Sequence, residues 1–454
     1  MTDKNPLTTT LVEEEPRGDD LPPARAWLIG IGSPEDNFAS CGEVRSVEAP
    51  HIVHFGRAEQ ADVVIRTDVP GSTKVEIPYG WVSGTHATLD VSGGPGGLTF
   101  TLEDHDSRNG TLVNGHRIAG RVIVRSQDII EIGRSFWMIR QVRQRRSRVQ
   151  GLDALDGTGT CNPQLQQIER TLLRLAPSAI PIVLRGETGT GKQYMARAVH
   201  KASGRDGPFV LANLAALSSD RVEAVLFGND STPGLFEKAD RGTLMLDEMG
   251  ELSQLVQGKL LSALSEGRAA RVGESDARRF DVRLVCGTMH DLGRMVDAGR
   301  FRADLYSRLA GYVAELPPLR VRREDLGLLV RRSIMELNGE GRRVRVTSNA
   351  FRRILLRAWP FNVRQLRQTL TTASLLSSGD GTITADGLAE VLEQDDGLPE
   401  NPDEVRRVRA ELLRHLTEHD GDATATARAM GMEPGQIGRW IERFDLTVGA
   451  ASND

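Results

Sequence analysis

Residues 180–193 read IPIVLRGETGTGKQ, and this stretch decides how the middle of the chain folds. The apolar run at 180–185 is typical of a buried strand. It leads into a loop at 186–192 with three glycines. Glycine tolerates the positive φ angles that turn backbone N–H groups inward around an anion. A helix expected at about 193–201 adds its positive N-terminal end. The pattern predicts a phosphate-binding loop in which Lys192 reaches the phosphates of a nucleotide.

A second motif, GTLMLDE, lies downstream at 242–248. An apolar strand that ends in two carboxylates places them at the carboxyl edge of a parallel sheet, where ligands bind. Asp247 is predicted to hold Mg²⁺, and Glu248 to polarise an attacking water. Gln193 stands where serine or threonine would ligate the metal directly, which predicts weaker metal binding. The alternatives are an ordinary strand with a solvated acidic end and a glycine-rich turn that binds nothing.

The composition is that of a globular protein without a membrane span. The 454 residues are 39% hydrophobic and 26% charged, with a net charge of −5. No run approaches the ~18 consecutive apolar residues that cross a bilayer. The N-terminus lacks the basic-then-apolar order of a secretory signal. Cys41, Cys161 and Cys286 are far apart, so neither a disulfide framework nor a zinc site is expected. The predicted compartment is the cytoplasm.

Shifts in pattern along the chain predict several units. Short alternating runs between Gly, Asn and Asp clusters favour an all-β sandwich first. Apolar strands that alternate with helical stretches then favour a parallel α/β sheet, and helical patterns follow. The expected units are a disordered tail at 1–24, a sandwich at 25–142, a linker at 143–159, an α/β unit at 160–318, a helical unit at 319–392, a linker at 393–403 and a helical bundle at 404–446.

The middle of the chain resembles a known family. Its matching stretches are GETGTGKQ at 186, PFVLANLAAL at 208, LFG at 226, GTLMLDEMGEL at 242, EGRAARVG at 266, FDVRLVCGT at 280, GRFRADLYSRL at 299, LPPLRVRREDL at 316 and WPFNVRQLRQ at 359. Residues 160–392 thereby resemble the AAA+ domain of bacterial enhancer-binding proteins, the NtrC-like activators of sigma-54 RNA polymerase. The resemblance implies an α/β P-loop ATPase domain with a helical lid at 319–392.

The resemblance also implies cofactors and the residues that bind them. The cofactors are ATP, hydrolysed to ADP and phosphate, and Mg²⁺, with Asp247 as the metal residue. Thr288 sits at the sensor I position, although Met289 and His290 replace the family's usual Asn-Arg. Arg364 matches sensor II in the lid, where Phe361 replaces the usual glycine. The implied cofactor-binding residues are Gly186, Glu187, Thr188, Gly189, Thr190, Gly191, Lys192, Gln193, Asp247, Thr288 and Arg364.

Further roles follow from the same resemblance. Asn213 matches the residue that contacts the catalytic Glu248 and relays the nucleotide state. Arg302 and Arg308 match arginine fingers that reach into the site of a neighbouring subunit. Such a finger can be worth about 10³–10⁵ in rate, so the resemblance implies that catalysis requires an oligomeric ring.

One part of the family pattern is missing. The family carries a GAFTGA loop between LFG and the next G-x-F-E, and this loop touches the sigma factor. Here residues 226–237 read LFGNDSTPGLFE, in which both flanks are present and the span between them is several residues too short. We therefore expect that the protein does not remodel sigma-54 polymerase in the family's usual way.

The N-terminal sandwich resembles a forkhead-associated (FHA) domain, a reader of phosphothreonine peptides. The matching pieces are FGR at 55, VSGTHA at 82, DSRNGT at 106, VNG at 113 and DIIEIG at 128. The resemblance implies that Arg57, Ser83, Arg108 and Asn109 bind the phosphopeptide, with charge-assisted hydrogen bonds from arginine. His86 is expected to hold the loops together. The alternative is a sandwich that keeps the fold and binds no phosphopeptide.

The last helices resemble a Fis-type helix-turn-helix. The matching stretch is GDATATARAMGM at 421, followed by a helix from about 434 to 444. Gln436, Arg439 and Arg443 are predicted to face the major groove of DNA. Residues 403–446 contain seven arginines and nine acids, and this net negative charge predicts weak or dimer-dependent DNA binding. The alternative is a small helical bundle for oligomerisation.

Together these features predict a multidomain chain: an all-β FHA sandwich, an α/β AAA+ domain with a lid, and an all-α helix-turn-helix. We interpret it as a cytoplasmic transcriptional regulator. Its expected partners are DNA at promoter or enhancer sites, a phosphothreonine-containing protein and further copies of itself, from a dimer to a hexameric ring. RNA polymerase holoenzyme is an open candidate. The alternative functions are a phosphopeptide-binding scaffold with a slow or inactive ATPase, and a repressor that needs no ATP chemistry.

Overall fold

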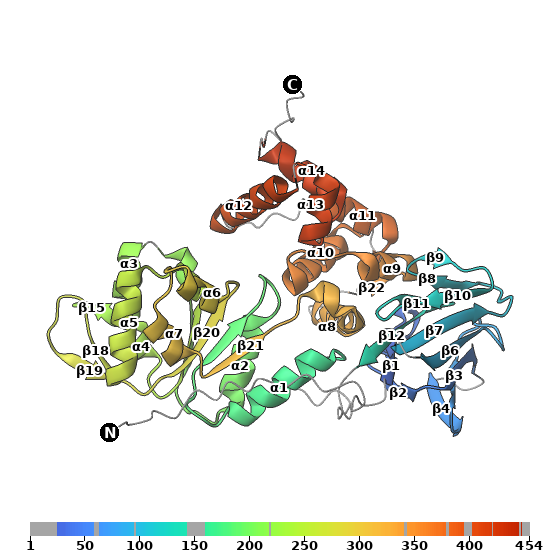
Figure 1. Ribbon diagram of the computed structural model, residues 1–454, viewed down its shortest axis with the longest axis horizontal. Coiled ribbons are helices and arrows are strands. Elements are labelled where there is room, and N and C mark those ends of the chain that lie inside the picture. Colours follow the sequence, from blue (N-terminus) through green and yellow to red (C-terminus); the bar gives the residue numbers. More distant parts are fainter. Residues whose placement is uncertain are drawn as a thin grey trace, which may run out of the picture.

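The computed structural model describes residues 25–58, 63–94, 97–142, 159–217, 219–339, 343–377, 381–394, 402–419, 421–444 and 446. The predicted tail at 1–24 and most of the two predicted linkers lie outside the described residues. Figure 1 shows the α/β sheet on the left, the β-sandwich on the right, the lid helices between them and the C-terminal helices above. Among the described residues, no helix combines the length and the apolar character that a membrane crossing requires.

The N-terminal unit is a sandwich of two six-stranded sheets, as the sequence predicts. In the first sheet, β1 pairs antiparallel with β2 and β12. Its strand order is β2 (Val44–Glu48), β1 (Arg25–Gly32), β12 (Ser135–Val142), β11 (Ile129–Ile132), β8 (Thr111–Val113) and β9 (His116–Arg117). A short helix η1 (Pro34–Asp36) follows β1.

The second sheet lies face to face with the first, because alternate residues of each strand are apolar and point inward. Phe55 of one sheet meets Trp137 of the other, with ring centroids 5.7 Å apart, in the middle of this core. The strand order is β10 (Arg121–Val124), β7 (Gly97–Asp104), β6 (Ala87–Gly94), β3 (His51–Arg57), β5 (Ser72–Ile77) and β4 (Val64–Val69).

The α/β unit is built on a parallel sheet of five strands with helices on both faces. Its order is β14 (Phe209–Asn213), β17 (Thr243–Asp247), β20 (Arg283–Thr288), β13 (Ile182–Arg185) and β21 (Tyr312–Glu315). Successive residues of a strand point to opposite faces. Met245 of β17 therefore packs with α1 and α2, whereas Leu244 and Leu246 pack with α3, α5 and α7.

The remaining elements of the α/β unit surround this sheet. The helices are α1 (Pro163–Leu175), α2 (Lys192–Ala202), η3 (Leu214–Ala216), α3 (Ser219–Phe227), α4 (Leu235–Lys238), η4 (Met249–Glu251), α5 (Gln254–Glu266), α6 (Leu292–Asp297) and α7 (Ala303–Leu309). Two short hairpins pair β15 (Gly228–Asn229) with β16 (Thr232–Pro233) and β18 (Arg268–Ala270) with β19 (Ala277–Arg279).

The lid and the C-terminal bundle are helical. The lid elements are η5 (Leu319–Val321), η6 (Arg323–Asp325), α8 (Leu326–Gly339), β22 (Arg345–Val346), α9 (Ser348–Leu356), α10 (Asn362–Leu376), β23 (Thr382–Ile383) and α11 (Ala385–Gln394). The bundle consists of α12 (Pro402–Glu418), α13 (Ala423–Met430) and α14 (Pro434–Arg443). Asp422 caps α13 through its side chain, and Gly431 ends it with a φ of 66°.

Candidate functional site

The glycine-rich loop connects β13 to α2 at the carboxyl edge of the sheet. Gly189 and Gly191 adopt φ angles of 78° and 107°, in the left-handed region that favours glycine. Helix α2 begins at Lys192, so its N-terminal end points into the loop. A cavity of about 540 Å³ opens there between the sheet and the lid. From the sequence-predicted set, it is lined by Thr188, Gly189, Thr190, Gly191, Lys192, Gln193, Asn213, Asp247, Glu248 and Arg364.

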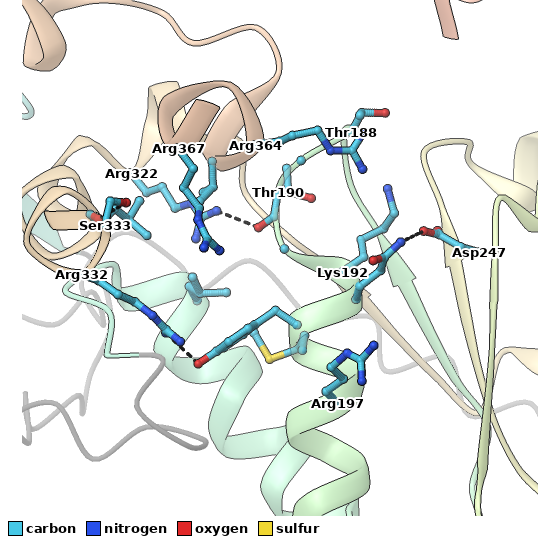
Figure 2. A pocket seen from close by; sticks show the side chains of 18 of the residues that line it. Thr188, Thr190, Lys192, Arg197, Asp247, Arg322, Arg332, Ser333, Arg364 and Arg367 are labelled. Carbon is cyan, nitrogen blue, oxygen red and sulfur yellow. Dashed lines mark hydrogen bonds between the residues drawn. The ribbon is translucent and has the colours of Figure 1, made fainter. Parts of the chain in front are cut away.

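Figure 2 shows how the polar side chains lie in this cavity. The Nζ of Lys192 donates to the carbonyl oxygens of Gly186 at 2.8 Å and Glu187 at 3.4 Å. The amide Nε2 of Gln193 donates to Oδ2 of Asp247 at 3.1 Å. The residue in the expected metal position therefore binds the expected metal carboxylate directly. Asp247 and Gln193 together offer oxygen ligands of the kind that Mg²⁺ prefers.

Glu248 is held in an unusual backbone conformation. Its φ of 62° and ψ of 46° are left-handed, which is uncommon for a residue with a side chain. Its backbone N–H donates to Oδ1 of Asp247 at 3.1 Å. Strain of this kind concentrates at functional sites. The turn fixes the carboxylates of Asp247 and Glu248, which are both buried, at one edge of the cavity.

Asn213 lies beside this pair because β14 and β17 run in register, with Asn213 opposite Asp247. Its side-chain oxygen accepts from the N–H of Ala215 at 3.0 Å and caps η3. The amide is thus fixed within the cavity lining. Its expected contact with Glu248 stays a prediction.

Gly186, Glu187 and Thr288 do not line the cavity. The carboxylate of Glu187 forms a bidentate ion pair with Arg320, at 2.6 and 2.8 Å, and accepts from Asn362. The hydroxyl of Thr288 is fully buried and accepts from the N–H of His290 at 3.0 Å. Their predicted role in cofactor binding stays a prediction. In the structure Thr288 braces the loop, because its carbonyl accepts from the N–H of Gly186.

The expected arginine fingers lie outside the cavity lining. Arg302 precedes α7, is about half-exposed and pairs with Asp304 at 2.7 Å. Arg308 lies on α7 and donates to the carbonyl of Leu264 at 3.1 Å. Since neither side chain lines its own chain's cavity, a role for them in nucleotide chemistry requires a second copy of the chain.

The lid touches the loop directly. The N–H of Val363 donates to the carbonyl of Gly189 at 3.0 Å, and Nδ2 of Asn362 donates to that of Thr188 at 3.0 Å. The backbone of Phe361 lies at this contact. Its ring packs toward that of Trp440 of α14, with ring centroids 6.3 Å apart. The substitution of the family's glycine therefore leaves the contact between lid and loop in place.

Sequence reasoning missed several cations that line the same cavity. They are Arg197, Arg322, Arg332 and Arg367. Arg322 is buried and donates to the carbonyl of Thr190 at 2.8 Å (Figure 2). Arg322 lies within the LPPLRVRREDL stretch at 316–326, which is one of the stretches that carry the family resemblance. That stretch was the signal from which Arg322 could have been predicted. Together with Lys192 and Arg364 they give six cations, against the four carboxylates of Glu169, Asp247, Glu248 and Glu336, so the cavity lining is net positive, which favours a polyphosphate ligand.

A tight hairpin lies where the family has its sigma-contacting loop. Gly228 pairs with Pro233 and Asn229 with Thr232, which leaves Asp230 and Ser231 as the turn. The side chain of Asn229 accepts from the N–H of Thr232 at 2.9 Å and closes it. Arg271, from the loop between β18 and β19, donates to the carbonyl of Asn229 in the hairpin at 3.4 Å and forms a bidentate pair with Glu237 of α4. That pair holds the pKa of Glu237 down at about 2.

The four predicted phosphopeptide residues come together at one end of the sandwich. The N–H of Arg57 donates to the carbonyl of Ser83 at 3.0 Å, and the N–H of Arg108 donates to the Ser83 hydroxyl at 3.1 Å. Asn109 donates to the carbonyl of Trp81. His86 is fully buried between these loops, and its Nδ1 accepts from the N–H of Ser83. Burial lowers the pKa of His86, which suits the structural role expected for it.

The C-terminal bundle corrects one expectation. Gln436 is only 2% exposed, so its side chain is not available to a DNA groove. Gln436 was predicted to face the major groove, but its side chain is buried, as is that of the following Ile437. The side chains of Arg439 and Arg443 lie outside the described residues.

Comparison with protein-family models identifies three domains. Residues 159–314 match the sigma-54 interaction domain, residues 320–420 the AAA+ ATPase lid domain, and residues 53–133 the FHA domain. The lid match extends beyond the expected boundary at 392 and includes α12.

The chain is similar to curated proteins that are named as regulators. The Nif-specific regulatory protein of Rhodobacter capsulatus is 34% identical over 355 residues, which covers 65% of this chain and 61% of that protein. The DNA-binding transcriptional regulator NtrC of Klebsiella pneumoniae is 37% identical over 258 residues, covering 54% of each. The chain spans less than two thirds of the length of these relatives. Among solved structures, NtrX from Brucella abortus in complex with ATP has 30% identity and a TM-score of 0.47, with 63% of this chain and 69% of that chain covered.

Proposed function

We propose that this chain, which matches the sigma-54 interaction domain, the AAA+ lid domain and the FHA domain, is a transcriptional regulator of the cytoplasm that binds ATP and DNA. ATP with Mg²⁺ controls the assembly of a homo-oligomer, between a dimer and a hexameric ring. DNA at promoter or enhancer sites locates the protein. A phosphothreonine-containing protein, received by the FHA loops, sets its state.

One observation carries this proposal: the cavity between sheet and lid. It combines Lys192 at a helix N-terminus, two buried carboxylates and the lid residue Arg364 around a single space. Cations and backbone N–H groups bind the phosphates. Glu248 polarises the attacking water, and Arg302 and Arg308 of a neighbouring copy complete the charge stabilisation for hydrolysis to ADP and phosphate.

Nucleotide binding and hydrolysis are tested separately. Lys192→Ala is expected to abolish binding of a fluorescent ATP analogue. Glu248→Gln is expected to keep binding and to lower the hydrolysis rate by about 10²–10⁴-fold, the usual worth of a positioned base. Hydrolysis at the wild-type rate by Glu248→Gln contradicts the ATPase assignment. Binding without hydrolysis in the wild type, even when the protein is oligomeric, favours the alternative.

The alternative is a phosphopeptide-binding scaffold with a slow or inactive ATPase. The hydrogen bond from Gln193 to Asp247 favours it, since the amide occupies the carboxylate that a metal needs. A regulator that never hydrolyses ATP can still switch, because binding alone shifts an equilibrium between two states.

The short hairpin supports a role without the family's usual remodelling of sigma-54 polymerase. The base of the hairpin is bound to Arg271, and only two residues form its turn. In vitro transcription with sigma-54 and housekeeping holoenzymes side by side, with ATP, is the test. ATP-dependent open complexes with the sigma-54 enzyme would overturn this part of the proposal.

Recognition by the two outer domains is tested with ligands. A phosphothreonine peptide library is expected to bind the wild type, and Arg57→Ala to lose that binding. Dephosphorylated peptides are the control. Arg439→Ala and Arg443→Ala are expected to weaken DNA binding, measured at several salt concentrations.

A further inference from the structure

The FHA sandwich and the AAA+ lid share one hydrophobic core. Phe351 of α9 lies between Phe38 and Phe136 of the sandwich, with ring centroids 4.7 and 5.1 Å apart. Gly327 of α8 rests on the carbonyl of Ile31, where a Cβ would stand at 1.7 Å. The sandwich therefore lies flush against the lid, at a place where no side chain fits.

Charged groups cross the same boundary in its interior. Arg140 of β12 forms an ion pair with Glu324 of η6 and donates to the carbonyl of Val321 at 3.2 Å. Glu324 also accepts from Nδ2 of Asn162 at 2.9 Å. The side chain of Glu324 is fully buried, and that of Arg140 is 16% exposed. A buried carboxylate of this kind depends on its partner, because an unpaired charge inside a protein is costly.

The chain of contacts continues from Glu324 to the phosphate loop. Its neighbour Asp325 accepts from the hydroxyl of Thr160 and the N–H of Cys161, both at 2.7 Å. Arg322 lies 3.9 Å from Asp325 and donates to the carbonyl of Thr190 at 2.8 Å. Arg322 is buried and lines the nucleotide cavity (Figure 2). One buried set of charges thus runs from an FHA strand to the loop that cradles phosphate.

We propose that Arg322 is a positioning residue of the nucleotide site, and that Arg140 of the FHA domain keeps it in place through Glu324 and Asp325. The inference rests on the proposed binding of nucleotide to this cavity. Arg140 neutralises the charge of Glu324. Arg322 can then keep its ion pair with Asp325 and its hydrogen bond to the carbonyl of Thr190. Without Arg140, the uncompensated Glu324 draws Arg322 away from the loop. The FHA domain is then a structural part of the nucleotide site, in addition to its role in recognition.

The test is the Kd of a fluorescent ADP analogue, measured with the full chain and with variants shown by circular dichroism to be folded. Arg140→Met is expected to weaken binding about tenfold, the worth of a charged hydrogen bond at the loop. Arg140→Met combined with Glu324→Gln is expected to recover affinity to within about threefold of the wild type, because no unpaired charge remains. If Arg140→Met does not fold, Arg140→Lys replaces it with a smaller expected loss, since lysine lacks the planar fork.

The matched control is Arg352→Met. Arg352 of the lid forms a bidentate pair with the buried Glu131 of the sandwich, at 2.6 and 2.7 Å, without a contact to the phosphate loop. It is expected to lower the melting temperature and to leave the Kd within about twofold. Equal losses of affinity in Arg140→Met and Arg352→Met overturn the inference, because general loosening then explains both. An unchanged Kd in Arg140→Met overturns it as well. No ADP binding by the wild type overturns the proposed function and this inference together.

Discussion

At the scale of single residues, Gln193 occupies the predicted metal position of the proposed nucleotide site. A serine or threonine hydroxyl in its position would ligate Mg²⁺ and leave Asp247 free. The glutamine amide instead donates to Asp247 at 3.1 Å. One oxygen of the Asp247 carboxylate therefore accepts a hydrogen bond from Gln193. A water molecule bound to Mg²⁺ would otherwise donate to that oxygen.

Gln193→Ser is therefore expected to tighten Mg²⁺ binding in the presence of nucleotide by roughly 2- to 10-fold, the worth of one polar contact. Hydrolysis is expected to rise with it. The measurement is the Mg²⁺ dependence of nucleotide binding and of phosphate release. Gln193→Ala is the control, because it frees Asp247 without supplying a ligand. If Mg²⁺ binding tightens equally in both variants, the release of Asp247 explains the effect. Residue 193 is then not a metal ligand position.

Glu324 predicts a pH dependence of stability. Burial raises its pKa to about 7, although Arg140 acts in the opposite direction. The folded state then binds a proton at Glu324 at pH values where the unfolded chain, in which this carboxyl has its ordinary pKa of 4.5, has lost it. The stability from this group is fully present below about pH 4.5 and is lost as the pH rises through about 7.

Urea denaturation of the wild type and Glu324→Gln, between about pH 5 and about pH 8, measures this contribution. The free energy of unfolding of the wild type, relative to the variant, is expected to fall across that range. Remote titrating groups, including His51, His86 and His200, cancel in the difference, whereas the neighbouring Asp325 titrates together with Glu324 and contributes to it. Parallel curves would show that Glu324 has an ordinary pKa in the folded protein.

Some residues of the site could be predicted from sequence because their role is local. The glycines, Lys192, Asp247 and Glu248 act through a loop and two strand ends, and consecutive residues specify both. Glu187 lies within the same motif, yet its partners Arg320 and Asn362 come from the lid. Arg322 was missed for the same reason. Its burial depends on packing between units that no local pattern describes.

At the scale of elements, Phe361 links the lid to the C-terminal helices. Its ring packs in one hydrophobic cluster with Leu412, Ile437 and Trp440. Its backbone forms the turn at the N-terminus of α10 that meets Gly189. A single residue at this turn thus contacts the phosphate loop on one side and the bundle on the other.

Phe361→Gly, which restores the family's residue, is expected to release the C-terminal bundle from the lid. Phe361 is partly buried, so its ring is worth less than the about 1.5–3 kcal/mol of a fully buried phenylalanine, and its removal should increase the population with an undocked bundle. Hydrogen exchange of the α12 and α14 amides is expected to accelerate, while that of α10 stays slow. Phe361→Leu keeps most of the apolar area and is the control. Unchanged exchange in Phe361→Gly would mean that other contacts hold the bundle.

At the scale of the whole molecule, the sandwich and the lid share one hydrophobic core. The sequence divides them with a linker and a complete α/β unit, and each has its own periodic pattern. The interface was not predictable, because Ile31, Phe38 and Phe351 look like ordinary core residues of their own units. The sandwich has a separate inner core around Trp137. Its outer residues join the lid's core, so we expect the lid and the FHA domain to unfold as one unit.

The last prediction follows from this shared core. Phe38→Ala removes a ring that is 1% exposed and packs edge-on against Phe351 of the lid. A loss of about 3–5 kcal/mol is expected. Phe55→Ala is the matched variant, since Phe55 is equally buried but packs against Trp137 inside the sandwich. Residues of one cooperative unit lose protection together, so both substitutions should accelerate hydrogen exchange in β1 and in α9. If Phe55→Ala affects only the strands and leaves the α9 amides protected, the sandwich and the lid are separate folding units. The shared core would then be an interface that opens without unfolding either side.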